Sequence, residues 1–140
     1  KRPLEVGADK IARAAHTAIH VLARLRELVQ RPIPLVWTPE FQGLAAIEVY
    51  PGATLKGRRL ESSGYKKSDK ASKAARLHIA ECVRDELPAL GRFADVKVDV
   101  FDACLCLLAA KDFLRCRTLQ PDDLELARRE GWIWVRDPDQ

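Results

Sequence analysis

Residues 44–60, "LAAIEVYPGATLKGRRL", decide which fold class the sequence indicates. Ile47 and Val49 alternate with the charged Glu48, the period of two that is typical of a half-buried strand. Pro51 is expected to end this strand, and a basic loop to follow it. A charge within an otherwise apolar strand needs an explanation, either as a solvated side chain or as part of a site.

Apolar residues at helical spacing predict helices around this strand. The expected helices cover residues 9–29, 69–87 and 99–115, with a shorter one over 120–129. Strands are expected at 45–50 and 131–135, with at most a short edge strand at 35–37. Residues 51–68 are expected to be loop, with room for one helical turn. Helices that alternate with strands favour an α/β architecture.

The length and composition indicate one globular domain over residues 1–140. Apolar residues make up 47% and charged residues 31%, values of a soluble, folded protein. No apolar run approaches the roughly 20 residues of a membrane span, so we expect no membrane partner. Nothing resembles a signal peptide.

The cysteines and the first residues bear on the origin of the chain. Its four cysteines lack C-x-x-C spacing and three are expected to be buried on helices, which favours reduced thiols in the cytoplasm. The chain contains no methionine and opens on "KRPLEVGADK". We therefore expect a fragment of a longer protein.

Basic residues are concentrated between positions 56 and 76. They are Lys56, Arg58, Arg59, Lys66, Lys67, Lys70, Lys73 and Arg76, against only Glu61 and Asp69. Such a local excess attracts phosphate backbones, and the alternative is a solvated loop and helix face.

Three carboxylates form a second candidate group. Asp99 and Asp102 share a face at the start of the apolar helix, where they could equally cap it. Glu48 could likewise be a solvated side chain. If the strand and the helix converge, however, the carboxylates would repel each other unless a cation lay between them. Oxygen ligands suit Mg²⁺ or Mn²⁺, and two such ions roughly 3.5–4 Å apart can activate water against a phosphodiester.

Several motifs occur together over residues 7–135. "GADKIARAAHTA", "IEVYPGATL", "GYKK", "DVFDACLCLLAA" and "ARREGWIWV" follow one another in this order. The set resembles the predicted RNase H-like nucleases called domain of unknown function 429. The resemblance implies a ribonuclease H-like mixed sheet of five strands flanked by helices, with clustered carboxylates that bind divalent metal.

The resemblance also implies roles for individual residues. Glu48 matches the strand carboxylate and Asp102 the helix carboxylate, with Asp99 and Asp9 as further acids and Lys66 near the phosphates. Members usually begin with strands that carry another aspartate, and nothing before Lys1 supplies them here. We therefore expect the C-terminal part of such a domain, without its first strands and inactive on its own.

The function expected from the sequence is metal-dependent hydrolysis of nucleic-acid phosphodiesters, DNA or RNA. Glu48, Asp102 and Asp99 would serve catalysis, and with Asp9 they would hold Mg²⁺ or Mn²⁺. The expected phosphate contacts are Lys66, Lys67, Arg59 and Lys70. The alternatives are a non-catalytic nucleic-acid-binding module and a protein-interaction domain on the same fold.

Overall fold

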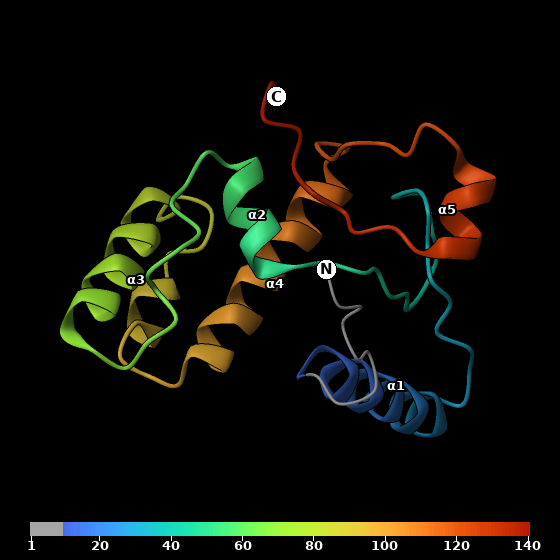
Figure 1. Cartoon of the computed structure of the whole chain (residues 1–140). Helices are drawn as coiled ribbons and strands as arrows, with labels where there is room; N and C mark the ends of the chain where they lie inside the picture. Colours follow the sequence, from blue (N-terminus) through green and yellow to red (C-terminus); the bar gives the residue numbers. More distant parts are fainter. Residues whose placement is uncertain (1–9) are drawn as a thin grey trace, which may run out of the picture. The chain divides into compact units, whose positions relative to one another are not determined.

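The computed structural model describes residues 10–140, which divide into two compact units (Figure 1). The first unit includes the chain up to Leu35 together with Gln42–Ala46. The second includes Val36–Phe41 and Ile47–Gln140. The second unit contains all the residues that are discussed below as a candidate site.

The first unit is built on helix α1 (Lys10–Val29), which confirms the first predicted helix. After the helix, Leu35 forms an isolated parallel bridge with Ala46, whose amide donates to the Pro34 carbonyl at 2.9 Å. Pro32 and Pro34 have no amide hydrogen to continue such a ladder. The pairing therefore stops at one bridge.

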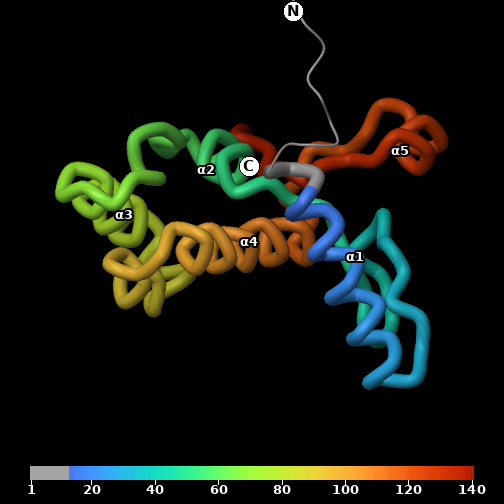
Figure 2. The backbone as a smooth tube through the Cα atoms, turned by 60° about the horizontal axis from the view of Figure 1, so that its bottom comes forward, coloured from blue at the N-terminus to red at the C-terminus, as the bar shows by residue number. Residues whose placement is uncertain are grey.

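The second unit consists of short helices arranged around one long helix. These elements are α2 (Pro51–Gly57), α3 (Lys70–Cys82), the 3₁₀ helix η1 (Leu90–Phe93), α4 (Val98–Leu114) and α5 (Leu124–Glu130). In Figures 1 and 2, α4 runs alongside α2. The 3₁₀ helix η1 contacts both α3 and α4. The sequence predicted α4 almost to its ends, whereas α3 stops well before Leu87.

The core of the second unit lies between α2, α3, η1 and α4. Its buried members are Leu55, Tyr65, Ile79, Ala80, Val83, Leu90, Phe101, Leu105 and Leu108. Near the other end of α4, Phe113 packs edge-on against the buried Trp134, with ring centroids 4.8 Å apart. One side of α4 thus packs against the core cluster and, near its end, against Trp134, while Val100, Leu107 and Leu114 stay exposed.

The expected ribonuclease H-like mixed sheet is wrong: residues 10–140 form helices and isolated bridges, with no strand or sheet among them. The two predicted strands do lie side by side, because the Trp134 amide donates to the Glu48 carbonyl at 2.9 Å. Thr118 and Arg136 form one antiparallel bridge. Alternating apolar residues produced extended chain here, but each segment lacks the consecutive bonds of a ladder.

Pro51 begins a helix instead of opening a loop. Tyr50 is extended and acts as the N-cap of α2, and Pro51 occupies the first turn. Proline favours this position because its ring presets the helical φ angle and its missing amide hydrogen would have no partner there. The prediction for residues 51–68 allowed for one helical turn within a loop, and did not place this helix of seven residues at Pro51.

Two further observations concern the cysteines and the membrane. The expectation that three cysteines are buried is wrong, since Cys82 and Cys116 are exposed and Cys104 and Cys106 only half-buried. None of the helices in the described part of the chain has the length and apolar character needed to cross a bilayer.

Candidate functional site

A basic cleft of about 340 Å³ lies at the start of α3. We call it the lysine cleft, after the five lysines that line it: Lys66, Lys67, Lys70, Lys73 and Lys97. Arg76, Asp69 and Asp95 also line it. The charged lining is therefore predominantly positive.

Both acidic residues of the lysine cleft already have partners. Asp69 is the N-cap of α3 and accepts the Ser72 amide at 2.7 Å, a bond that lowers the pKa of this carboxyl. Asp95 forms an ion pair with Lys73, with 2.5 Å between oxygen and nitrogen. Lys67, Lys70 and Lys97, by contrast, form no ion pair among residues 10–140.

Arg76 builds the cleft wall from inside. Its side chain lies in the buried part of α3, with only 4% of the residue exposed. The guanidinium donates to three main-chain carbonyls: Tyr65 at 2.5 Å, Lys67 at 2.9 Å and Ala94 at 2.6 Å. Arg76 therefore fixes the loop that carries Lys66 and Lys67 against the segment before α4, through donors on Nε and Nη1.

Asp102 joins this loop to α4. It accepts the Tyr65 hydroxyl at 2.7 Å on one carboxylate oxygen and Lys66 Nζ at 3.0 Å on the other. Tyr65 is buried and its ring centroid lies 6.0 Å from that of Phe101. Burial raises the pKa of the Tyr65 phenol, and the bond to Asp102 raises it further. The phenol therefore stays a proton donor, which holds the carboxylate in place.

Lys66 is the member of this group that reaches solvent. Its side chain is 47% exposed, and Nζ lies 5.4 Å from the ring centroid of Tyr65 and 5.8 Å from that of Tyr50. The ammonium is thus held by one carboxylate and two aromatic rings, at distances typical of cation–π contacts. A phosphate that entered the lysine cleft would compete with Asp102 for this charge.

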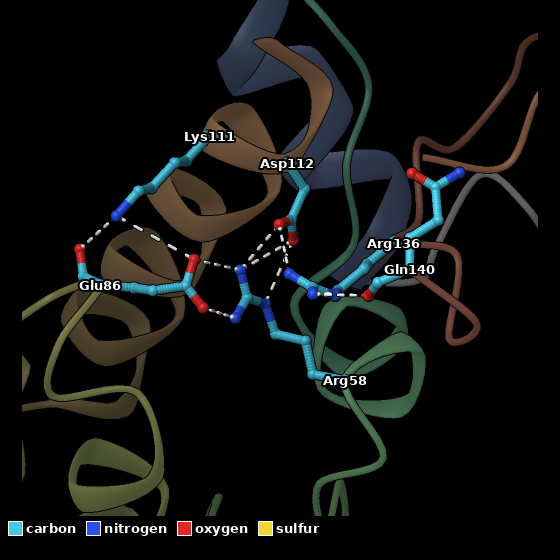
Figure 3. A network of polar contacts seen from close by, with 6 residues as sticks. All are labelled: Arg58, Glu86, Lys111, Asp112, Arg136 and Gln140. Atoms are coloured by element: carbon cyan, nitrogen blue, oxygen red, sulfur yellow. Dashed lines mark hydrogen bonds and ion pairs between the residues drawn. The ribbon is translucent and has the colours of Figure 1, made fainter. Parts of the chain in front are cut away.

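A buried ion-pair network lies at the other end of α4 (Figure 3). Asp112 has a side chain 1% exposed and accepts from Arg58 at 2.8 Å and from Arg136 at 3.0 Å. Arg58, which is 6% exposed, also pairs with Glu86 at 2.5 Å. Lys111 donates to the Glu86 carbonyl at 3.0 Å. These five residues, the ion-pair network, tie the chain after α2, the chain after α3, α4 and the C-terminal segment together.

The network also requires a close approach between backbones. A side-chain carbon on Gly57, the last residue of α2, would lie 2.6 Å from the Arg136 carbonyl oxygen. Arg136 in turn donates to the Gln140 carbonyl at 2.7 Å. Glycine at position 57 is therefore what lets the C-terminal segment pass over the end of α2.

Residues 2–125 match the model of the family described as Protein of unknown function (DUF429). This match covers most of the 140 residues. The chain belongs to this family. No curated protein and no solved structure matches the sequence significantly.

In this DUF429 chain three of the four predicted phosphate contacts come together. Lys66, Lys67 and Lys70 line the lysine cleft. Arg59 does not line it; its guanidinium forms an exposed ion pair with Asp139 at 2.9 Å. Of the other basic residues in this stretch, Arg58 and Arg76 have buried side chains. The number of basic residues in the sequence could not reveal this.

The predicted acids of the DUF429 chain have different surroundings. Asp102 contacts Tyr65 and Lys66, as described. Glu48 is exposed, and its carboxylate lies against Gly131, with Oε2 3.3 Å from where a side-chain carbon of that glycine would be. Asp99 is exposed in the first turn of α4, where Lys97 and not an acid is the N-cap. Asp9 lies outside the described residues.

These donors do not make a metal centre by themselves. Within the part of the chain that the structure describes, no group of three or more histidine, cysteine, aspartate or glutamate side chains lies close enough to hold an ion. Asp102 offers one carboxylate, already bonded to a phenol and an ammonium. The Mg²⁺ or Mn²⁺ site stays a prediction.

The sequence did contain signals for the residues that were missed. Asp112 follows an apolar run in α4, and an acid in a buried helix needs a cationic partner. Tyr65 belongs to the "GYKK" motif of this DUF429 chain, but its contact with Asp102 depends on how α4 packs. The partners Arg58 and Arg136 could not be deduced, since they come from distant parts of the sequence.

Proposed function

We propose that this protein binds the phosphate backbone of nucleic acid in the lysine cleft. The observation that carries the proposal is the local charge balance: five lysines line one cleft whose two acids are a helix cap and the partner of Lys73. Lysine is a common phosphate ligand, and several in one cleft make a continuous electrostatic footprint.

The rigid support of this cleft favours a ligand-binding role over a solvated surface. Solvated surface lysines need no buried side chain to fix the backbone that carries them. Here the buried Arg76 bonds to the carbonyls of Tyr65 and Lys67 and so sets the backbone from which Lys66 and Lys67 project. A loop held in this way loses less conformational entropy when it binds.

The test is a titration of fluorescein-labelled DNA and RNA strands, followed by fluorescence anisotropy at several salt concentrations. Replacing Lys67 and Lys70 by alanine should weaken binding on every sequence and reduce the slope against log salt by about one for each lysine replaced. Arg129→Ala removes one positive charge from α5, outside the cleft, and serves as the matched control for each single lysine replacement. Absence of binding at low salt, or equal weakening by Arg129→Ala, would refute the proposal.

Metal-dependent phosphodiester hydrolysis is the second candidate. The observation that favours it is that Asp102 bonds to Lys66, a residue of the lysine cleft, so that one carboxylate lies next to the proposed phosphate site. Glu48 and Asp99 are the further acids that the family resemblance assigns. Because the described residues do not gather three donors, the first measurement is Mn²⁺ binding by electron paramagnetic resonance, for the wild type and Asp102→Asn. Equal binding by both would remove Asp102 as a ligand.

A further inference from the structure

Tyr50 is an exposed aromatic ring with a defined position. It is the N-cap of α2, and 52% of the residue is exposed. The ring lies over Gly52, where a side-chain carbon would come within 3.1 Å of the ring atom Cε1. Because Gly52 has no side chain, the Tyr50 ring can lie against the first turn of α2.

Two lysines lie in the surroundings of this ring. Lys66 Nζ is 5.8 Å from the Tyr50 centroid and also lines the lysine cleft. Tyr50 itself lines a second cleft, of about 510 Å³, together with Gly52, Ala53, Lys56, Ser62 and Ser63. Tyr50 therefore lines one hollow, which contains Lys56, while Lys66, whose ammonium lies near its ring, lines the other.

This alternation of cations and an aromatic face matches the chemistry of an unpaired strand. Phosphates along such a strand contact lysines, while a base between them can stack on an aromatic side chain. In a duplex the base faces are covered by their neighbours, so only an unpaired base can make this contact.

We propose that Tyr50 is a base-stacking residue and that the preferred ligand of the protein is single-stranded nucleic acid. The strand runs from the lysine cleft past Lys66 and Tyr50 to Lys56. This inference rests on the proposed function, because it assumes that the phosphates lie in the lysine cleft. It adds the class of ligand and a residue that no electrostatic argument would select.

The experiment compares three labelled probes of equal length by fluorescence anisotropy: oligothymidylate, its duplex with oligoadenylate, and an abasic strand. The wild type should bind oligothymidylate most tightly. Tyr50→Ala should weaken that binding about 5- to 150-fold, the range that stacking of one base supports, and leave the other two probes unchanged. Tyr50→Phe keeps the ring and should bind like the wild type.

Two further variants separate stacking from charge. Tyr50→Ala removes no charge, so its slope against log salt should equal that of the wild type, whereas Lys56→Ala should lower the slope by about one. Gly52→Ala places a methyl group under the Tyr50 ring and should weaken oligothymidylate binding without changing duplex binding. Circular dichroism of each variant confirms that the helices are retained.

The outcomes are distinguishable from those of the proposed function. If oligothymidylate, duplex and abasic strand bind alike, or if Tyr50→Ala binds oligothymidylate like the wild type, the stacking role is refuted while phosphate binding in the lysine cleft still stands. If no probe binds at low salt, both proposals fail.

Discussion

Lys66 and Asp102 form an ion pair, with Nζ 3.0 Å from one carboxylate oxygen, although Lys66 also lines the cleft in which we place phosphates. The lysine therefore has two alternative anionic partners. Asp102 holds the ammonium near the cleft when no ligand is present. The same carboxylate reduces the positive charge that a ligand meets.

Asp102→Asn should increase affinity for nucleic acid. A partly exposed ion pair is worth up to about 1 kcal/mol, so release of Lys66 should tighten binding roughly 2- to 5-fold. Asp99→Asn removes the same charge one turn earlier on α4 without touching Lys66, and should have a smaller effect. Weaker binding by Asp102→Asn in the presence of Mg²⁺ would instead support a metal ligand.

Arg76→Lys should weaken nucleic-acid binding although it keeps the charge. The ammonium cannot reproduce the geometry of three bonds to Tyr65, Lys67 and Ala94. We expect a loss of roughly 2–3 kcal/mol in the free energy of unfolding, measured in urea, and faster amide exchange over residues 65–67. Arg92→Lys, at an exposed position in η1, should leave both measurements unchanged.

Asp112→Ala should be among the most destabilising single replacements in the second unit. It would remove one of the two carboxylates that pair with the buried guanidinium of Arg58, and breaking a buried ion pair costs about 3–5 kcal/mol in typical proteins. Asp122→Ala, at an exposed position, should stay within about 0.5 kcal/mol. Joint replacement of Arg58 by Met and Asp112 by Leu should lower the free energy of unfolding, measured in urea, by less than Asp112→Ala alone. A larger loss in the double variant would show that the network is not buried as described.

Stability should fall in acid through Glu86. Its hydrogen bond from Arg58 lowers the pKa of this carboxyl to about 2, from an ordinary value of 4.5. Between these values the unfolded chain binds more protons than the folded one. The contribution of Glu86 to stability is therefore complete above pH 4.5 and is lost as the pH falls toward 2. Glu86→Gln should flatten that part of the curve of unfolding free energy against pH, and an unchanged slope would contradict the assignment.

The four thiols should react at two rates. Cys82 and Cys116 are exposed and should react quickly with a disulfide reagent at neutral pH. Burial raises the pKa of Cys104 and of Cys106, where the charge of Asp102 adds to the effect, so these two should react slowly. In concentrated urea all four should react alike, and a single fast phase in the native protein would contradict the packing of α4.

Elements with strong local determinants could be predicted from the sequence. α1 and α4 follow from apolar spacing over several turns, and α3 begins where Asp69 offers a cap. The predicted sheet could not be judged from local sequence. Residues 45–50 have the alternation of a strand whether or not neighbouring segments pair with them. Pro51 was equally ambiguous, since proline ends strands and also begins helices.

The candidate site was predictable in its charge and not in its geometry. Proximity in sequence placed Lys66, Lys67 and Lys70 near each other, and the structure gathers them in one cleft. It could not reveal that Arg76 turns inward or that Arg59 pairs with Asp139. Those outcomes depend on contacts between residues far apart in the chain.

Asp102 and Asp112 lie on the same helix, ten residues apart, which is about 15 Å along the axis of α4. One contacts the residue that enters the lysine cleft and the other anchors the ion-pair network. A rotation or shift of this single helix therefore changes both sets of contacts at once. Selection for a stable network and selection for a well-placed Lys66 act on the same rigid element, so neither can drift without the other.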